Sequence, residues 1–202
     1  MLHWNECESN VLRASRRTDG GAWRHLIRAM QRPVGRERDS RRSSARRSLS
    51  RTECVTYNLA MYKFQISLHP RSDEVTAGGE LLRDGAAYPT LRVPGTALAA
   101  TFPLTFEAGA AALASFERMY VEPDGSFVWV SSKSDQPWQV DGVLYDRDDR
   151  LLFIDLKGSC PAEDFDRILK ACGWPESPVM MQLTHDAAFV DEETFRELAS
   201  TD

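Results

Sequence analysis

Three charged side chains at the end of a predicted strand have types and spacing that could do chemistry. Asp155 and Lys157 follow the apolar run at residues 151–154. Residues i and i+2 of a strand point to the same face, so this carboxylate and this ammonium project together. Asp141 lies on the preceding predicted strand, and a hairpin turning at residues 146–149 would lay it beside them. The sequence therefore predicts that two carboxylates and one lysine converge.

Two carboxylates and a lysine suit the hydrolysis of a phosphate ester with a bound metal ion. Mg²⁺ usually takes one or two protein carboxylates and leaves its other positions to water and phosphate. The metal polarises a phosphoryl oxygen, and a lysine orients the attacking water or offsets the charge of the transition state. We predict Asp141 and Asp155 as ligands of Mg²⁺ or Mn²⁺ and Lys157 as the water-positioning or charge-stabilising group. Glu117, four residues after Leu113 on a predicted helix, is the auxiliary acid.

The elements that must position these residues follow from periodicity and from capping and turn residues. Polar and apolar residues alternate over residues 62–68 and predict a strand that ends at Pro70. Residues 71–104 are rich in Gly, Pro, Ala and Thr and predict loops with one or two short strands. The rest predicts a helix at 108–120 capped by Thr105, an antiparallel meander at 127–131, 138–145 and 151–156, a helix from Pro161 to Gly173, a strand at 179–183 and a short helix capped by Asp191. The expected fold class is α/β (α+β) with a central mixed sheet.

This order of elements resembles the core of the PD-(D/E)XK nuclease superfamily, the restriction endonuclease-like enzymes. That core runs helix, three-stranded meander, helix, strand, with an acid on the second strand and an acid-x-Lys on the third. The matching residues are Asp141, Asp155 and Lys157, with Glu117 as the helix acid. The resemblance covers about residues 105–185, and Val140 stands where the family often has Pro. It implies a Mg²⁺-dependent nuclease, a hydrolase whose partner is nucleic acid.

A non-catalytic interpretation explains the same residues. Asp155 and Lys157 could form a surface salt bridge, worth about 0–1 kcal/mol, while Asp141 solvates a turn. Residues 61–202 carry 12 basic and 24 acidic groups, a net charge of −12, whereas phosphate-binding domains usually show a basic patch. A nuclease would need its cations gathered on one face. The alternative function is therefore an acidic interaction module, an immunity-like or adaptor protein, that binds a protein partner.

Residues 1–60 differ in composition from the rest of the chain. They carry 13 Arg, no Lys and 6 acidic groups, and residues 36–51 repeat Arg and Ser with Leu49 as the one large apolar residue. Such a stretch cannot bury enough apolar surface to offset its ordering entropy. We predict a disordered leader before one domain at residues 61–202. Three origins for it stay open: a targeting peptide, a nucleic-acid-binding arm, or a non-native segment translated from an early start codon.

The remaining features predict a cytoplasmic protein with no membrane partner. The apolar runs fall far short of the roughly 20 residues that span a membrane, and no signal-like segment follows the N-terminus. The four cysteines form no CxxC pair and no Cys/His cluster. His185 is expected as a solvated or capping residue, and Cys160 as a small buried residue. Three tryptophans could stack on bases, although core and hairpin packing is the commoner role, and they are Trp129, Trp138 and Trp174.

Overall fold

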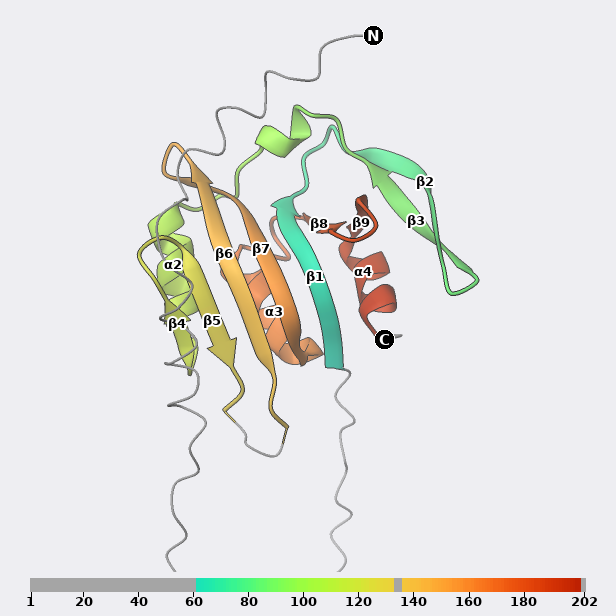
Figure 1. Cartoon of the computed structure of the whole chain (residues 1–202). Coiled ribbons are helices and arrows are strands. Elements are labelled where there is room, and N and C mark those ends of the chain that lie inside the picture. The colour runs from blue at the N-terminus through green and yellow to red at the C-terminus, as the bar shows by residue number, and fades with distance from the viewer. Residues whose placement is uncertain (1–60, 133–135, 201–202) are drawn as a thin grey trace, which may run out of the picture. The chain divides into compact units, whose positions relative to one another are not determined.

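The sheet that carries the predicted site is antiparallel throughout (Figure 1). This computed structural model describes residues 61–132 and 136–200, so the prediction of a disordered leader at residues 1–60 lies outside the described residues. The strands are β1 (Met61–Pro70), β2 (Thr76–Arg83), β3 (Ala86–Arg92), β4 (Met119–Val121), β5 (Ser126–Val130), β6 (Gln139–Arg147), β7 (Arg150–Pro161), β8 (Val179–Leu183) and β9 (Ala188–Asp191). They form one sheet in the order β2-β3-β9-β8-β1-β7-β6-β5-β4. The class is α+β.

The prediction of a mixed sheet was wrong. Helix α3 (Ala162–Ala171) connects β7 to β8, and these two strands run in the same direction. They would form a parallel pair if they were neighbours. Instead β1 lies between them, and its Ile66 is opposite Leu156 on β7 and Leu183 on β8. Because β1 is antiparallel to both, every pair of neighbouring strands in the described sheet is antiparallel.

The three α-helices begin at or next to the residues that the sequence predicts as helix starts. Thr105 precedes α2 (Phe106–Ala114) and its side chain accepts a hydrogen bond from the Ala108 amide, while Pro161 precedes α3. Asp191 caps α4 (Glu192–Ala199) through the Thr194 amide. Helix α2 ends before the predicted residue 120 because the chain turns at Arg118, whose φ is 60°, and enters β4. Among the described residues, no helix has the length and apolarity to cross a membrane.

The segment predicted as loops contains a long hairpin and one turn of 3₁₀ helix. Strands β2 and β3 pair through the turn Asp84-Gly85, where both residues have positive φ, 54° and 82°. A two-residue Asp-Gly turn with this geometry is a standard hairpin connection, so the sequence did contain the signal. The 3₁₀ turn η1 (Ala97–Ala99) then leads toward the β6–β7 end of the sheet, where the Phe102 amide donates to the Leu151 carbonyl.

The core lies between one face of the sheet and the three helices, which Figure 1 shows on the same side. Tyr62 and Phe64 of β1 contact Phe165 of α3 and Phe195 of α4, and the last two rings stack with centroids 4.9 Å apart. Burying one such side chain contributes about 1.5–3 kcal/mol. Within the described residues no helix covers the opposite face of β1, β6 and β7, and we call this the open face.

Candidate functional site

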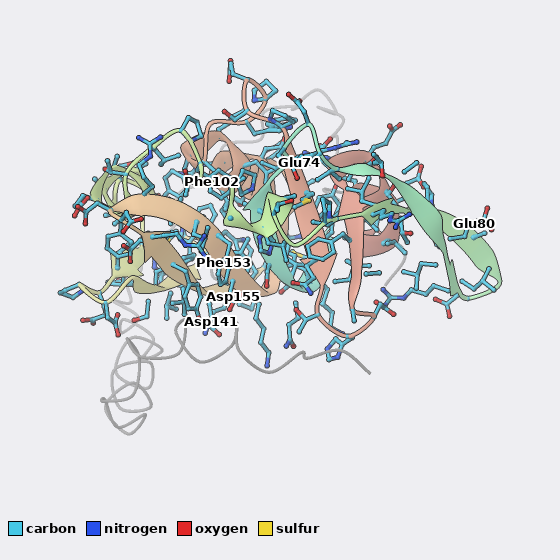
Figure 2. The ribbon with its side chains drawn as sticks, turned by 90° about the horizontal axis from the view of Figure 1, so that it is seen from above. Glu74, Glu80, Phe102, Asp141, Phe153 and Asp155 are labelled. Atoms are coloured by element: carbon cyan, nitrogen blue, oxygen red, sulfur yellow. The ribbon has the colours of Figure 1, made fainter. Side chains whose placement is uncertain are left out.

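The strand register brings Asp141, Asp155 and Lys157 to the open face. Asp141 of β6 and Gln65 of β1 are both opposite Lys157 of β7, and Ser67 of β1 is opposite Asp155. Directly opposed residues in an antiparallel sheet project to the same side. In Figure 2 the labelled Asp141 and Asp155 lie on the same side of the ribbon. Asp141 and Lys157 are exposed and Asp155 is half-buried, so the predicted shared face is present.

The Asp155 carboxylate is held by two hydroxyl groups from neighbouring strands. Ser67 Oγ donates to Asp155 Oδ1 at 2.5 Å, and the Tyr145 hydroxyl donates to the same carboxylate. Partial burial and then the charge and hydrogen bond of Asp155 raise the pKa of Tyr145 above its ordinary value. The Tyr145 ring also stacks on Phe153 with centroids 4.4 Å apart. Asp155 therefore joins β1, β6 and β7 through hydrogen bonds to its charged form.

We expect Ser67→Ala and Tyr145→Phe each to lower the free energy of unfolding by about 1 kcal/mol. Each change removes one part-buried hydrogen bond to a carboxylate, and a typical hydrogen bond contributes about that much. Urea unfolding at pH 7 measures the change. Ser159→Ala is the matched control, because Ser159 lies on the same strand as Asp155 and its hydroxyl has no partner among the described residues. Equal losses in all three variants would contradict a bonding role for Asp155.

Lys157 and Asp141 are less constrained than Asp155. Gln139 Nε2 donates to Asp141 Oδ1 at 2.7 Å. Lys157 forms no salt bridge within 4.0 Å among the described residues. The structure therefore provides neither a closed ion pair between Asp155 and Lys157 nor a fixed contact between Asp141 and Lys157.

Glu117, the predicted auxiliary acid, lies on the other side of the sheet. Its backbone carbonyl accepts a hydrogen bond from Trp129 Nε1 at 3.0 Å, and Trp129 is buried beneath α2 and α3, where its ring contacts Phe116 and Arg167. The helix that was expected to extend to residue 120 ends at Ala114. Glu117 is therefore not part of the cluster formed by Asp141, Asp155 and Lys157.

The donor set available for a metal ion is small. Within the described ranges no three His, Cys, Asp or Glu side chains come close enough to hold a metal. Asp141 and Asp155 match the one or two carboxylates that Mg²⁺ usually takes, but Asp155 already accepts two hydroxyl hydrogen bonds. The two acids thus fit a Mg²⁺ or Mn²⁺ ion only as a minimal site, completed by water or by phosphate.

A pocket of about 630 Å³ lies next to Lys157, at the point where β8 ends. Its lining includes residues 63–66 of β1, residues 157–159 of β7, the last residue of β8 with the three that follow it (183–186), and three residues of α4. Ligand pockets typically have about 300–1,000 Å³. Four successive residues of β1 line one wall. Because successive side chains of a strand point to opposite faces, the pocket lies along the edge of β1 and not on one of its faces.

The pocket gathers cations from separate parts of the chain. Lys63, Lys157 and Arg83 line it together with His185, and Asp186 is the one acid among its lining residues. Residues 61–202 have twice as many acidic as basic groups, so this local balance opposes that of the domain. The pocket is not predictable from a short stretch of sequence, because its cations come from β1, β2 and β7. The one local signal is the polar, Lys-containing face of residues 63–67.

The other candidates from the sequence are mostly core residues. Cys160 is buried, and burial raises the pKa of its thiol well above the ordinary range; burial raises the pKa of Cys172 to about 12. Trp129 packs against Trp138 with centroids 4.9 Å apart, and Trp174 packs against the same core. Core roles for Cys160 and for these tryptophans are confirmed.

His69 of β1 carries no clear signal in the sequence, and its ring packs against Phe153 of β7 and Phe189 of β9. The residue is 8% exposed, its Nε2 atom has no hydrogen-bond partner within the described ranges, and its ring stacks on Phe153 at 5.2 Å. Burial lowers the pKa of His69 to about 4. The residue is therefore a neutral part of the packing at neutral pH.

Comparison of the whole chain with protein-family models, with curated proteins and with solved structures gave no match.

Proposed function

We propose that this domain is a non-catalytic recognition module that binds a protein partner at the pocket beside β1. The observation that carries the proposal is the composition of the pocket. Its lining has the cations Lys63, Lys157 and Arg83 together with apolar residues of α4. Binding sites combine apolar walls with a few placed polar groups, and this pocket has both.

The state of the reactive side chains supports a binding role. A thiol attacks as its thiolate, and both described cysteines are buried with raised pKa values. His69 is buried and lacks a partner for Nε2. Asp155, a half-buried acid on the open face, accepts hydrogen bonds from Ser67 and Tyr145. These groups stabilise the sheet, and the pocket offers charge and apolar surface.

Selection from a random peptide library displayed on phage tests the proposal. We expect the full chain to enrich peptides that bind it and that lose binding to the Lys63→Glu/Lys157→Glu double variant. The control is Arg92→Glu/Lys170→Glu, which makes the same change of net charge at exposed residues outside the pocket. A library that yields no specific binder would count against a recognition module.

The second candidate function is a metal-dependent phosphodiesterase. The observation that favours it is the placement of Asp141, Asp155 and Lys157 in adjacent register on the open face. A bound Mg²⁺ would supply Lewis-acid activation of a phosphate ester and of water. Asp141 and Asp155 would hold the ion, and Lys157 would orient the phosphate through its exposed ammonium group.

Calorimetric titration of Mg²⁺ and Mn²⁺ into the full chain separates the two candidates. For a recognition module we expect no binding heat at millimolar metal that depends on Asp141. Asp141→Asn is the informative variant, because Asp141 is exposed and its replacement leaves the hydrogen bonds of Asp155 in place. Asp146→Asn, an exposed acid farther along β6, is the control. Binding heat that Asp141→Asn removes and Asp146→Asn keeps would favour the phosphodiesterase and justify assays on DNA and RNA.

A further inference from the structure

Strand β1 has a free edge at the pocket. On one side, β7 pairs with β1 from Met61 to Leu68, whereas on the other side β8 begins its pairing only at Ile66. The Thr184 amide donates to the Gln65 carbonyl at 3.3 Å, and the chain then turns away into β9. Among the described residues no strand pairs with residues 61–65 on this side.

The backbone of Lys63 points toward this free edge. In an antiparallel strand the N–H and C=O groups of one residue point to the same side, and the side alternates along the chain. The Gln65 carbonyl points toward β8, so the Gln65 amide and both backbone groups of Lys63 point the same way. Unpaired strand edges are templates for an added strand.

The two sides of the pocket differ in chemistry. Lys63 and Lys157 lie on the open face, and Leu183, Phe195 and Leu198 lie toward the helices. Successive side chains of an extended peptide point to opposite sides. A strand in this position would therefore place alternate residues against cations and against apolar side chains.

We infer that an extended segment of a protein partner adds to the sheet beside residues 61–65 of β1, in line with β8. The acidic residues of this segment point toward the open face, and its apolar residues point toward α4. The inference rests on the proposed function and names the chemistry of its partner. Charge complementarity selects an acidic segment, since three cations and one acid line the pocket of a domain that is otherwise acidic. The free backbone edge selects a polypeptide over a small anion.

A synthetic hexapeptide that alternates Glu and Val tests the inference by NMR on the full chain. We expect the peptide to slow hydrogen exchange of the Lys63 and Gln65 amides at least tenfold. Polarisation of the labelled peptide should show at least tenfold weaker binding to Lys63→Glu/Lys157→Glu, with Arg92→Glu/Lys170→Glu unchanged. Two N-methylated peptides test the backbone pairing. Methylation of the amides that face β1 should abolish binding, and methylation of the amides on the other edge of the peptide should leave binding intact.

Several results would overturn the inference. Equal binding by both N-methylated peptides, or displacement of the peptide by inorganic phosphate without any change in amide exchange, would reduce the site to charge attraction. If the Lys63 and Gln65 amides already exchange slowly in the protein without peptide, another part of the chain occupies the edge. If their protection from exchange increases with protein concentration, a second copy of the chain occupies it.

The inference and the proposed function fail in different ways. Some peptides selected from the library could bind the chain and leave the exchange of the Lys63 and Gln65 amides unchanged. That result would support the recognition module and contradict strand addition. A library without binders would reject the module itself.

Discussion

Gly158→Ala is expected to lower the free energy of unfolding by about 4 kcal/mol, from backbone strain and overpacking that each cost about 1–3 kcal/mol. Gly158 has φ of 142°, a conformation that side chains rarely adopt. A Cβ atom there would lie 2.1 Å from the Gln139 carbonyl oxygen and 3.0 Å from Val140 Cα on the neighbouring strand. Because these are backbone atoms, β6 and β7 would have to separate where they hold Asp141 opposite Lys157.

Urea unfolding followed by tryptophan fluorescence measures this loss, since Trp129 is buried in the core beside Val140. Gly79→Ala is the matched control: Gly79 lies in β2, and a Cβ atom there would have no neighbour within 4 Å. We expect that variant to stay within about 1 kcal/mol of the wild type. Equal unfolding midpoints for the two variants would show that β6 and β7 tolerate a side chain at position 158.

His69 is expected to make the domain less stable by about 3 kcal/mol as pH falls from 7 to 4. Burial lowers its pKa from 6.5 to about 4 in the folded state. Between these values the unfolded chain binds a proton that the folded chain does not, so the free energy of unfolding falls with falling pH by up to about 1.4 kcal/mol per unit. Above pH 6.5 the imidazole is neutral in both states, and this stability is fully present.

The measurement is the free energy of unfolding as a function of pH for the wild type and for His69→Phe. Phenylalanine can keep the stacking on Phe153 and has no titrating group, so the difference between the two curves isolates His69 from the carboxylates that titrate in both proteins. His185→Gln is the control, since His185 is exposed. Parallel curves for the wild type and His69→Phe would mean that folding does not lower the pKa of His69.

The site and the pocket share one residue, which links the two functional candidates. Lys157 lies opposite Asp141 and also lines the pocket with Lys63. A peptide along β1 would place acidic side chains near this lysine, whereas a phosphate ester would meet it from the open face. If Lys157→Glu loses peptide binding but gives the same calorimetric titration with Mg²⁺ as the wild type, the recognition module is therefore favoured over the phosphodiesterase.

The amino-acid sequence by itself determined the local elements. Thr105, Pro161 and Asp191 begin helices because a capping side chain or a fixed φ acts within a few residues along the chain. The alternation in residues 62–68 and the i, i+2 spacing of Asp155 and Lys157 gave the shared faces of β1 and β7, because side chains in a strand have a period of two.

Only the tertiary structure decided which strands are neighbours. Periodicity states which residues share a face, but it does not state which strand lies beside which. The position of β1 between β7 and β8 made the sheet antiparallel and brought Ser67 to Asp155, 88 residues away along the chain. The early end of α2 left Glu117 on the far side of the sheet.

The pocket has the same kind of origin. It exists because β8 is half as long as β1, 5 residues against 10, and so leaves part of an inner strand without a partner strand from the described part of the chain. Its cations come from three strands that are distant in sequence. Non-local pairing of strands, which no short window of sequence contains, therefore decided where this protein has a free edge and which charges surround it.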